Sequence, residues 1–117
     1  MNTRKKGAEY EQVAMEYLRS QQVVILEHNY RNRKGEIDII GRDAEYTVFF
    51  EVKFRKDNCM GYPVESVNYG KQRTICRVAD YYRMTHHMGE FSPVRYDVVA
   101  ICGEEIMWYK NAFEHIY

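Results

Sequence analysis

The chain has 117 residues, of which 45% are hydrophobic and 29% charged, a composition typical of one globular domain spanning residues 1–117. Its longest hydrophobic run, Val98 to Cys102, is far shorter than the roughly 20 residues of a membrane helix, so we expect a soluble, cytoplasmic protein that has no membrane partner. Lys and Arg together number 17, as do Asp and Glu, and this zero net charge argues against strong non-specific attraction to nucleic acid.

The first predicted element is an amphipathic helix over residues 7–21. Its hydrophobic side chains recur with the spacing of one helix face, at Tyr10, Val13, Ala14, Tyr17 and Leu18. Glu11 lies beside this stripe and is expected at the edge of the buried face, either as an ordinary solvated residue or within reach of a site at the sheet edge. A short hydrophobic run at residues 23–26 predicts the first strand, and a basic loop at residues 31–34 follows it.

An antiparallel hairpin is predicted next, over residues 35–54, because two hydrophobic runs flank a polar tip at residues 42–45. Every second residue of the later run, from Val48 to Phe54, is hydrophobic, so that face of the strand is expected to meet the core. Glu51 and Lys53 therefore project side by side from the opposite face.

Asp38 interrupts the earlier run of the hairpin between two isoleucines, where a hydrophobic residue would be favoured. A turn near residues 43–44 would bring Asp38 roughly opposite Glu51, so that two carboxylates and Lys53 share one patch. Oxygen ligands of this kind suit Mg²⁺, and a lysine beside them can position or activate water, or neutralise charge, during phosphodiester hydrolysis. The same pattern also describes a strand face that is simply solvated, and spacing alone does not decide between the two interpretations.

The second half of the chain predicts one more helix and two more strands. A polar loop at residues 55–63 precedes a helix over residues 64–85, which Gly70 can interrupt. Strands at residues 94–101 and 106–110 then close the sheet. The sequence therefore predicts an α/β fold in the order α-β-β-β-α-β-β, in which helices flank a mixed central sheet of about five strands.

Taken in chain order, these motifs resemble the nuclease superfamily with the signature Asp…Glu-x-Lys, whose fold is restriction-endonuclease-like. More narrowly, the chain resembles the YraN-like bacterial family of endonuclease-like proteins, which is itself similar to archaeal Holliday-junction resolvases. The stretches that carry the resemblance are Glu11–Ala14, Asn29–Arg31, Gly35–Ile40, Phe50–Arg55, Pro63–Val67, Lys71 and Arg95–Val99.

The resemblance implies a metal-dependent DNA endonuclease whose cofactor is Mg²⁺ or Mn²⁺. The implied metal ligands are the carboxylates of Asp38 and Glu51, with the backbone carbonyl of Val52 as a further ligand. Lys53 would position or activate the water, and Glu11 would reach the same site from the helix. One departure is Tyr10, because the family usually has glycine at this position, and a tyrosine there could narrow the approach to Glu11.

The expected partner is DNA, branched or otherwise structured, and superfamily members of this size often form homodimers that cut two strands. Basic clusters flank the predicted site, and the candidates for phosphate contacts are Arg31, Arg33, Lys34, Arg55, Lys56 and Lys71. Each cluster taken singly is equally well explained as solvated charge. The sequence contains no finger and no base-reading helix, so recognition is expected to depend on DNA structure rather than on base sequence.

Two other functions also fit the sequence. The first is a catalytically inactive module that keeps the nuclease fold and binds nucleic acid without turnover. The zero net charge is compatible with such a module. A protein-interaction domain would instead use a surface rich in tyrosine, of which the chain has 11. Metal-independent DNA binding would favour the first, and the absence of salt-dependent binding to nucleic acid would favour the second.

Overall fold

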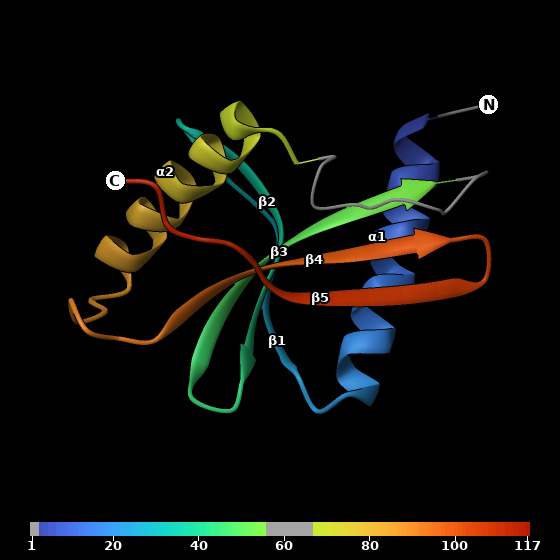
Figure 1. The fold of residues 1–117 in the computed structure, drawn as a ribbon, viewed down its shortest axis with the longest axis horizontal. Coiled ribbons are helices and arrows are strands. Elements are labelled where there is room, and N and C mark those ends of the chain that lie inside the picture. The colour runs from blue at the N-terminus through green and yellow to red at the C-terminus, as the bar shows by residue number, and fades with distance from the viewer. Residues whose placement is uncertain (1–2, 56–66) are drawn as a thin grey trace.

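The computed structural model describes residues 3–55 and 67–117, and the side chains from residue 7 onward within them. The elements are α1 (Thr3–Ser20), β1 (Val24–Asn32), β2 (Gly35–Asp43), β3 (Tyr46–Arg55), α2 (Tyr69–Thr85), β4 (Val94–Cys102) and β5 (Glu105–Phe113) (Figure 1). One mixed sheet has the strand order β1-β2-β3-β4-β5, with β3 and β4 parallel and the other neighbours antiparallel. The predicted α/β class and element order are confirmed. Within residues 3–55 and 67–117, neither helix is long and apolar enough to cross a membrane.

β1 is longer than the strand predicted at residues 23–26. It runs to Asn32 and so includes Arg31, which the sequence analysis places in a loop. Asn32 pairs with Gly35 of β2, which leaves a two-residue turn between the strands. The side-chain Oδ1 of Asn32 accepts a hydrogen bond of 2.9 Å from the backbone N–H of Lys34 and stabilises this turn. The predicted start of the loop at residue 31 is wrong, because a two-residue turn lets the two strands stay paired up to Asn32 and Gly35.

α2 begins at Tyr69 in the described part of the chain, later than the predicted start at residue 64. The side chain of Asn68 is its N-cap and accepts a hydrogen bond of 2.9 Å from the backbone N–H of Lys71. The helix continues without a break through Gly70. The predicted loop after β3 falls mainly on residues 56–66, which lie outside the described residues, and Lys56 lies there too.

The two helices cover opposite faces of the strongly twisted sheet (Figure 1). Ala14 and Leu18 of α1 share one hydrophobic cluster with Val48 and Phe50 of β3. The other cluster joins α2 to the opposite face of the sheet, where its members include Ile75, Val78, Phe49 and Tyr96. Phe49 is 1% exposed, so both faces of β3 are buried along its central part. Glu51, the residue that follows Phe50 in β3, therefore lies in a buried environment.

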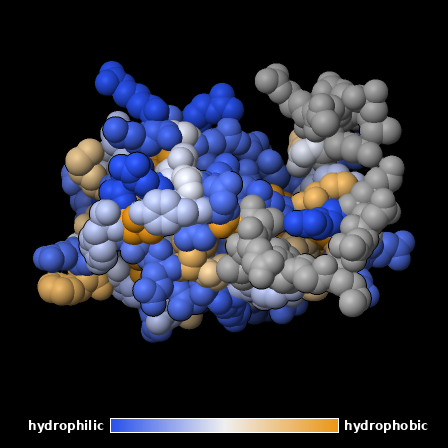
Figure 2. All heavy atoms as spheres, turned by 45° about the horizontal axis from the view of Figure 1, so that its top comes forward, coloured by the Kyte–Doolittle hydropathy of each residue, from blue (hydrophilic) through white to orange (hydrophobic). Residues whose placement is uncertain are grey.

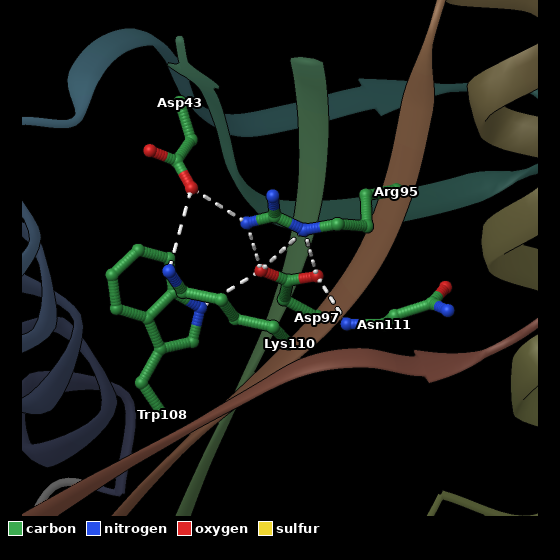
Figure 3. A network of polar contacts seen from close by, with 6 residues as sticks. All are labelled: Asp43, Arg95, Asp97, Trp108, Lys110 and Asn111. Atoms are coloured by element: carbon green, nitrogen blue, oxygen red, sulfur yellow. Dashed lines mark hydrogen bonds and ion pairs between the residues drawn. The ribbon is translucent and has the colours of Figure 1, made fainter.

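A buried ionic network fastens β4 to its neighbours (Figure 3). Asp97 of β4 is completely buried, and its carboxylate accepts hydrogen bonds from Arg95 Nη2 at 2.8 Å, Trp108 Nε1 at 2.8 Å and the backbone N–H of Asn111 at 2.9 Å. Arg95 Nη2 also donates to Asp43 Oδ2 of β2 at 2.9 Å. Because each oxygen of Asp97 has partners, this buried charge is stabilised where it lies, and it connects β2, β4 and β5 structurally.

Candidate functional site

The pairing of β2 with β3 ends where the candidate site begins. The last paired residues are Ile39 and Phe50, and the next opposed positions are Asp38 and Glu51. There Asp38 Oδ2 accepts a hydrogen bond of 2.8 Å from the backbone N–H of Val52. In a continuous ladder, the N–H of Val52 would donate to a backbone carbonyl of the neighbouring strand. Here it donates to the Asp38 carboxylate instead. The structure therefore brings Asp38 beside the Glu51 segment, as the sequence analysis expects.

The backbone of β2 is irregular at Asp38. Ile37 packs in the hydrophobic cluster under α2, whereas Ile39 packs in the cluster under α1. Two residues that are two positions apart in a regular strand share a face, so the alternation is broken between them. This irregularity lets hydrophobic residues on both sides of Asp38 reach a core while the carboxylate itself turns toward β3.

Glu51 is a buried carboxylate with a lysine on either side. It is 6% exposed, and its Oε1 lies 3.8 Å from Lys53 Nζ and 3.8 Å from Lys71 Nζ. Its Oε2 is buried and has no hydrogen-bond partner among the described residues. Leaving a buried carboxylate oxygen without a partner costs free energy. A cation, or a hydrogen-bond donor of a ligand, that contacts this oxygen would therefore be favoured.

Burial and neighbouring negative charges raise the pKa values of both strand carboxyls. The pKa of Glu51 is raised to about 7, chiefly by burial and also by the charge of Asp38, while Lys71 and Lys53 act to lower it. Burial also raises the pKa of Asp38, against the lowering effect of the hydrogen bond from Val52. With a pKa of about 7, the Glu51 carboxyl is partly protonated near neutral pH, and a bound cation would displace that proton.

Glu11 of α1 belongs to the same electrostatic group. Its pKa is raised to about 7, chiefly by burial and also by the charges of Asp38 and Glu36, whereas a hydrogen bond with Asn29 acts to lower it. Its Oε1 is buried and has no hydrogen-bond partner among the described residues. The first helix thus supplies a third carboxylate, whose protonation is coupled to that of Asp38.

Tyr10 has a structural role next to Glu11. Its ring stacks on that of Phe54 with the ring centroids 3.6 Å apart, and both belong to the hydrophobic cluster under α1. This contact fastens the first helix to the end of β3, the strand that carries Glu51 and Lys53. Tyr10 therefore orients the helix on which Glu11 lies.

A cavity of about 660 Å³ opens beside Glu11 and is lined by Gly7, Ala8, Glu11, Asn29, Arg31 and Glu36. These residues come from α1, β1 and β2. The volume is in the range of ligand-binding clefts. The small side chains of the helix leave this side of Glu11 open, so that a phosphate group and water molecules have room beside the carboxylate.

Glu36 is a member of the site that the sequence analysis misses. Its charge raises the pKa of Glu11, Asp38 and Glu51, and its Oε2 lies 2.7 Å from Arg31 Nη2. Its position two residues before Asp38 on the same strand is the only sequence signal for it. That spacing is common in exposed strands, and the role of Glu36 becomes visible only when α1 is placed above it.

The donor set of the site fits Mg²⁺ or Mn²⁺ as a partly solvated ion. Among the described residues, no group of three or more His, Cys, Asp and Glu side chains is arranged around a preformed metal position. Mg²⁺ commonly binds one or two carboxylates and completes its shell with water and substrate phosphate. Asp38 and Glu51 supply those carboxylates, and the buried Glu51 Oε2 offers an oxygen without a partner in the described chain. Val52 follows Glu51 in β3 and donates its backbone N–H to Asp38 Oδ2, so its backbone lies next to both carboxylates.

The predicted phosphate-binding residues lie in two places. Arg31, Arg33 and Lys34 are exposed at the end of the β1–β2 hairpin, and Arg55 is exposed at the end of β3. Lys71 differs from them, because its ammonium group lies 3.8 Å from Glu51, inside the candidate site. Figure 2 turns forward the side of the molecule that lies at the top of Figure 1, and this side is largely hydrophilic.

Comparison with known proteins places similar chains in several bacteria. The model of the family described as "Uncharacterised protein family UPF0102" matches residues 10–101, which include the candidate residues from Glu11 to Lys71. A UPF0102 protein of Lachnoclostridium phytofermentans is 44% identical over 97% of each chain. Another, from Marinobacter nauticus, is 44% identical over 96% of this chain and 94% of its own. A third, from Fusobacterium nucleatum, is 40% identical over 95% of this chain and 92% of its own.

Proposed function

This chain belongs to the protein family UPF0102, and from that premise we propose that it is a Mg²⁺- or Mn²⁺-dependent DNA endonuclease of the YraN-like kind. The observation that carries the proposal is the pairing of the half-buried carboxylate of Asp38 with the buried carboxylate of Glu51, with Lys53 beside them and with Glu51 Oε2 lacking a partner in the described chain. A purely structural site would satisfy its buried oxygens, as the network around Asp97 does.

The residues divide the chemistry of phosphodiester hydrolysis among them. Asp38 and Glu51 would hold the divalent ion, which supplies a Lewis acid for the phosphate when bound. Lys53 places a positive charge where negative charge develops on the phosphate oxygens. Glu11, with its pKa near 7, can accept a proton from the water whose oxygen bonds to phosphorus. The bond from phosphorus to the leaving sugar oxygen breaks, and that oxygen takes a proton from solvent.

Structured DNA is the proposed substrate. The chain has no net charge, so attraction to phosphate depends on local groups such as Arg31, Arg33, Lys34 and Arg55. The first three project from the end of a hairpin and the fourth from the end of β3, which favours contacts with backbone phosphates over base edges. A homodimer would present two such sites to a branched substrate.

Calorimetric titration of Mn²⁺ into the wild type and into Asp38→Ala tests the metal site. We expect binding by the wild type that the substitution removes. Glu45→Gln is the matched control, because Glu45 is an exposed carboxylate in the turn of the same hairpin and its loss should leave the titration unchanged. A junction or flap substrate is then incubated with Mn²⁺ and each variant, and cleavage by the wild type and Glu45→Gln alone is the expected result.

A catalytically inactive DNA-binding module would give a different pattern. The wild type would bind the same substrates with an affinity that neither Mn²⁺ nor Asp38→Ala changes, and none of them would be cleaved. Equal cleavage by the wild type, Asp38→Ala and Glu51→Ala would also contradict the endonuclease proposal, because the activity would then belong to a contaminant or to another site.

A further inference from the structure

A second cavity adjoins the candidate site on the other side of the β1–β2 hairpin. It has a volume of about 510 Å³ and is lined by Tyr30, Arg31, Asn32, Arg33 and Tyr81. Arg31 also lines the cavity that contains Glu11 and Glu36. Arg31 therefore lines both cavities. A polymeric ligand that lies along the end of the hairpin could occupy the two cavities together.

Close contact between the hairpin end and α2 builds this second cavity (Figure 1). A Cβ atom on Gly35 would lie 2.7 Å from Thr74 Cγ2 of the helix, so the absence of a side chain permits the approach. Asn32 Nδ2 donates a hydrogen bond of 3.4 Å to the backbone carbonyl of Val78. The ring of Tyr30 packs edge-on against Tyr82, with 5.3 Å between the ring centroids. The wall formed by the hairpin is thus held in place.

Tyr81 stands at the open side of the cavity. The residue remains 46% exposed although its aromatic ring is large. The guanidinium group of Arg33 is exposed in the adjoining turn, and that of Arg31 is exposed and paired with Glu36. Aromatic rings and guanidinium planes at the mouth of a cavity are the groups on which unpaired nucleobases stack, and arginine also pairs with the adjoining phosphate.

The cavity offers little for reading a base edge. Asn32 is the amide side chain in its lining, and both of its polar atoms contact the backbone, Nδ2 at Val78 and Oδ1 at Lys34. Stacking accepts any base because every base has a π-face. The lining therefore fits an unpaired nucleotide of any sequence better than one particular base.

We propose that the cavity between Tyr30 and Tyr81 binds an unpaired nucleotide of the DNA strand whose neighbouring phosphates pass Arg31 toward Glu11. The preferred substrate then carries a single-stranded segment, such as a flap, next to the position of cleavage. The inference rests on the proposed endonuclease for its catalytic meaning, whereas the binding itself needs neither metal nor turnover.

Fluorescence anisotropy in EDTA tests the binding without cleavage. The probes are a labelled blunt duplex and the same duplex with a single-stranded flap. Tyr81→Ala should weaken binding of the flap duplex by about tenfold, since stacking on one aromatic ring has that order of effect, and should leave the blunt duplex unchanged. Tyr81→Phe keeps the ring and should bind both probes as the wild type does.

Two further variants separate stacking from charge and from general disturbance. Phe91→Ala removes a ring that is 91% exposed beyond α2 and lines neither cavity, and it should change nothing. Arg33→Gln should weaken both probes and reduce the dependence of binding on salt, because it removes a phosphate contact. Excess deoxyadenosine monophosphate should not displace the flap, because a single nucleotide lacks the phosphate contacts of a strand.

Three results would overturn the proposal. Tyr81→Ala could bind the flap duplex as tightly as the wild type, it could lose the flap and blunt duplexes equally, or excess deoxyadenosine monophosphate could displace the flap. The Mn²⁺ titration with Asp38→Ala is independent of all three. If Mn²⁺ binds but the flap duplex is not preferred, the proposed endonuclease is retained and the stacking cavity is rejected. If the flap duplex is preferred but Mn²⁺ does not bind, the stacking cavity is retained and the endonuclease is rejected.

Discussion

At the scale of single residues, the candidate site differs from the other buried charges of this protein in how its oxygens are satisfied. Asp97 is surrounded by donors from Arg95, Trp108 and Asn111. Glu11 and Glu51 each keep a buried oxygen without a hydrogen-bond partner in the described chain. Folding has concentrated unsatisfied negative charge at one place, which destabilises the protein itself and prepares a position for a positive ligand.

Glu51→Gln should stabilise the metal-free protein at alkaline pH. The pKa of Glu51 is raised from 4.5 to about 7, so its contribution to stability is greatest below the unfolded value and is lost as the pH rises through 7. A shift of that size corresponds to about 3 kcal/mol, of which a neutral amide recovers a large part. Urea unfolding in EDTA, at about pH 5 and about pH 8.5, measures the difference. Equal dependence on pH in wild type and variant would contradict the assignment.

Lys71→Ala should raise the affinity for Mn²⁺ and lower the affinity for DNA. The Lys71 ammonium lies 3.8 Å from Glu51 Oε1, where it competes with a metal ion for the same carboxylate. At about pH 8.5, where protons no longer compete strongly, removal should strengthen Mn²⁺ binding by about threefold to tenfold. Arg73→Ala, an exposed basic residue of the same helix, is the control and should affect DNA binding alone. Weaker Mn²⁺ binding by Lys71→Ala would mean that the lysine supports the site instead.

At the scale of elements, the site depends on where strand pairing stops. β2 and β3 separate after Ile39 and Phe50, and the Asp38 carboxylate then bonds to the β3 backbone at Val52. α1 and α2 approach this opening from opposite faces and contribute Glu11 and Lys71. A hairpin that remained paired throughout would leave no free backbone N–H for Asp38.

Gly35→Ala and Gly7→Ala should have opposite effects on stability. Gly35 has a φ of +148°, and a Cβ there would lie 2.7 Å from Thr74, so we expect a loss of about 1–3 kcal/mol as the hairpin moves off α2. Gly7 lies in α1 with no atom within 4 Å of a new Cβ, so alanine there should be neutral or add up to about 1 kcal/mol. Thermal unfolding of the two variants measures both changes, and a stable Gly35→Ala would show that the hairpin contact is loose.

At the scale of the whole molecule, a zero net charge hides an uneven distribution. Asp38 repels both Glu11 and Glu51, and these three carboxylates lie close to lysines and to an exposed basic hairpin. Long-range attraction of DNA is therefore weak, and binding depends on contacts made at short distance, within roughly a Debye length of 8–10 Å.

Mn²⁺ should raise the melting temperature of the wild type by more than that of Asp38→Ala. A ligand that binds only the folded state stabilises it by about 2.7 kcal/mol at a concentration a hundredfold above Kd. For a chain of this length the shift should be of the order of 10 °C. The shift should be smaller at about pH 6 than at about pH 8, because protons occupy Glu11 and Glu51 below their pKa of about 7. Equal shifts in both proteins would place the ion elsewhere.

The order of elements could be predicted from the sequence because hydrophobic periodicity is local. The hairpin pattern also brought Asp38 to Glu51, although the turn centres slightly later than expected, at Ala44 and Glu45. Glu36 and the closeness of Lys71 to Glu51 could not be foreseen, because both depend on how the helices dock on the sheet. The full length of β1 could not be predicted, because its second half is mostly polar and its pairing with β2 across a two-residue turn has no clear sequence pattern.

The parallel pairing of β3 with β4 also constrains how the protein is made. β3 is buried on both faces, and the strand that completes its pairing on one edge is Val94–Cys102, late in the chain. During synthesis, β3 emerges with Val48, Phe49 and Phe50 well before that partner exists. A nascent chain ending before β4 therefore presents an apolar, unpaired edge, which is the kind of surface that aggregates or recruits chaperones. The same strand carries Glu51 and Lys53, whose charges interrupt that apolar edge until the second half of the protein arrives.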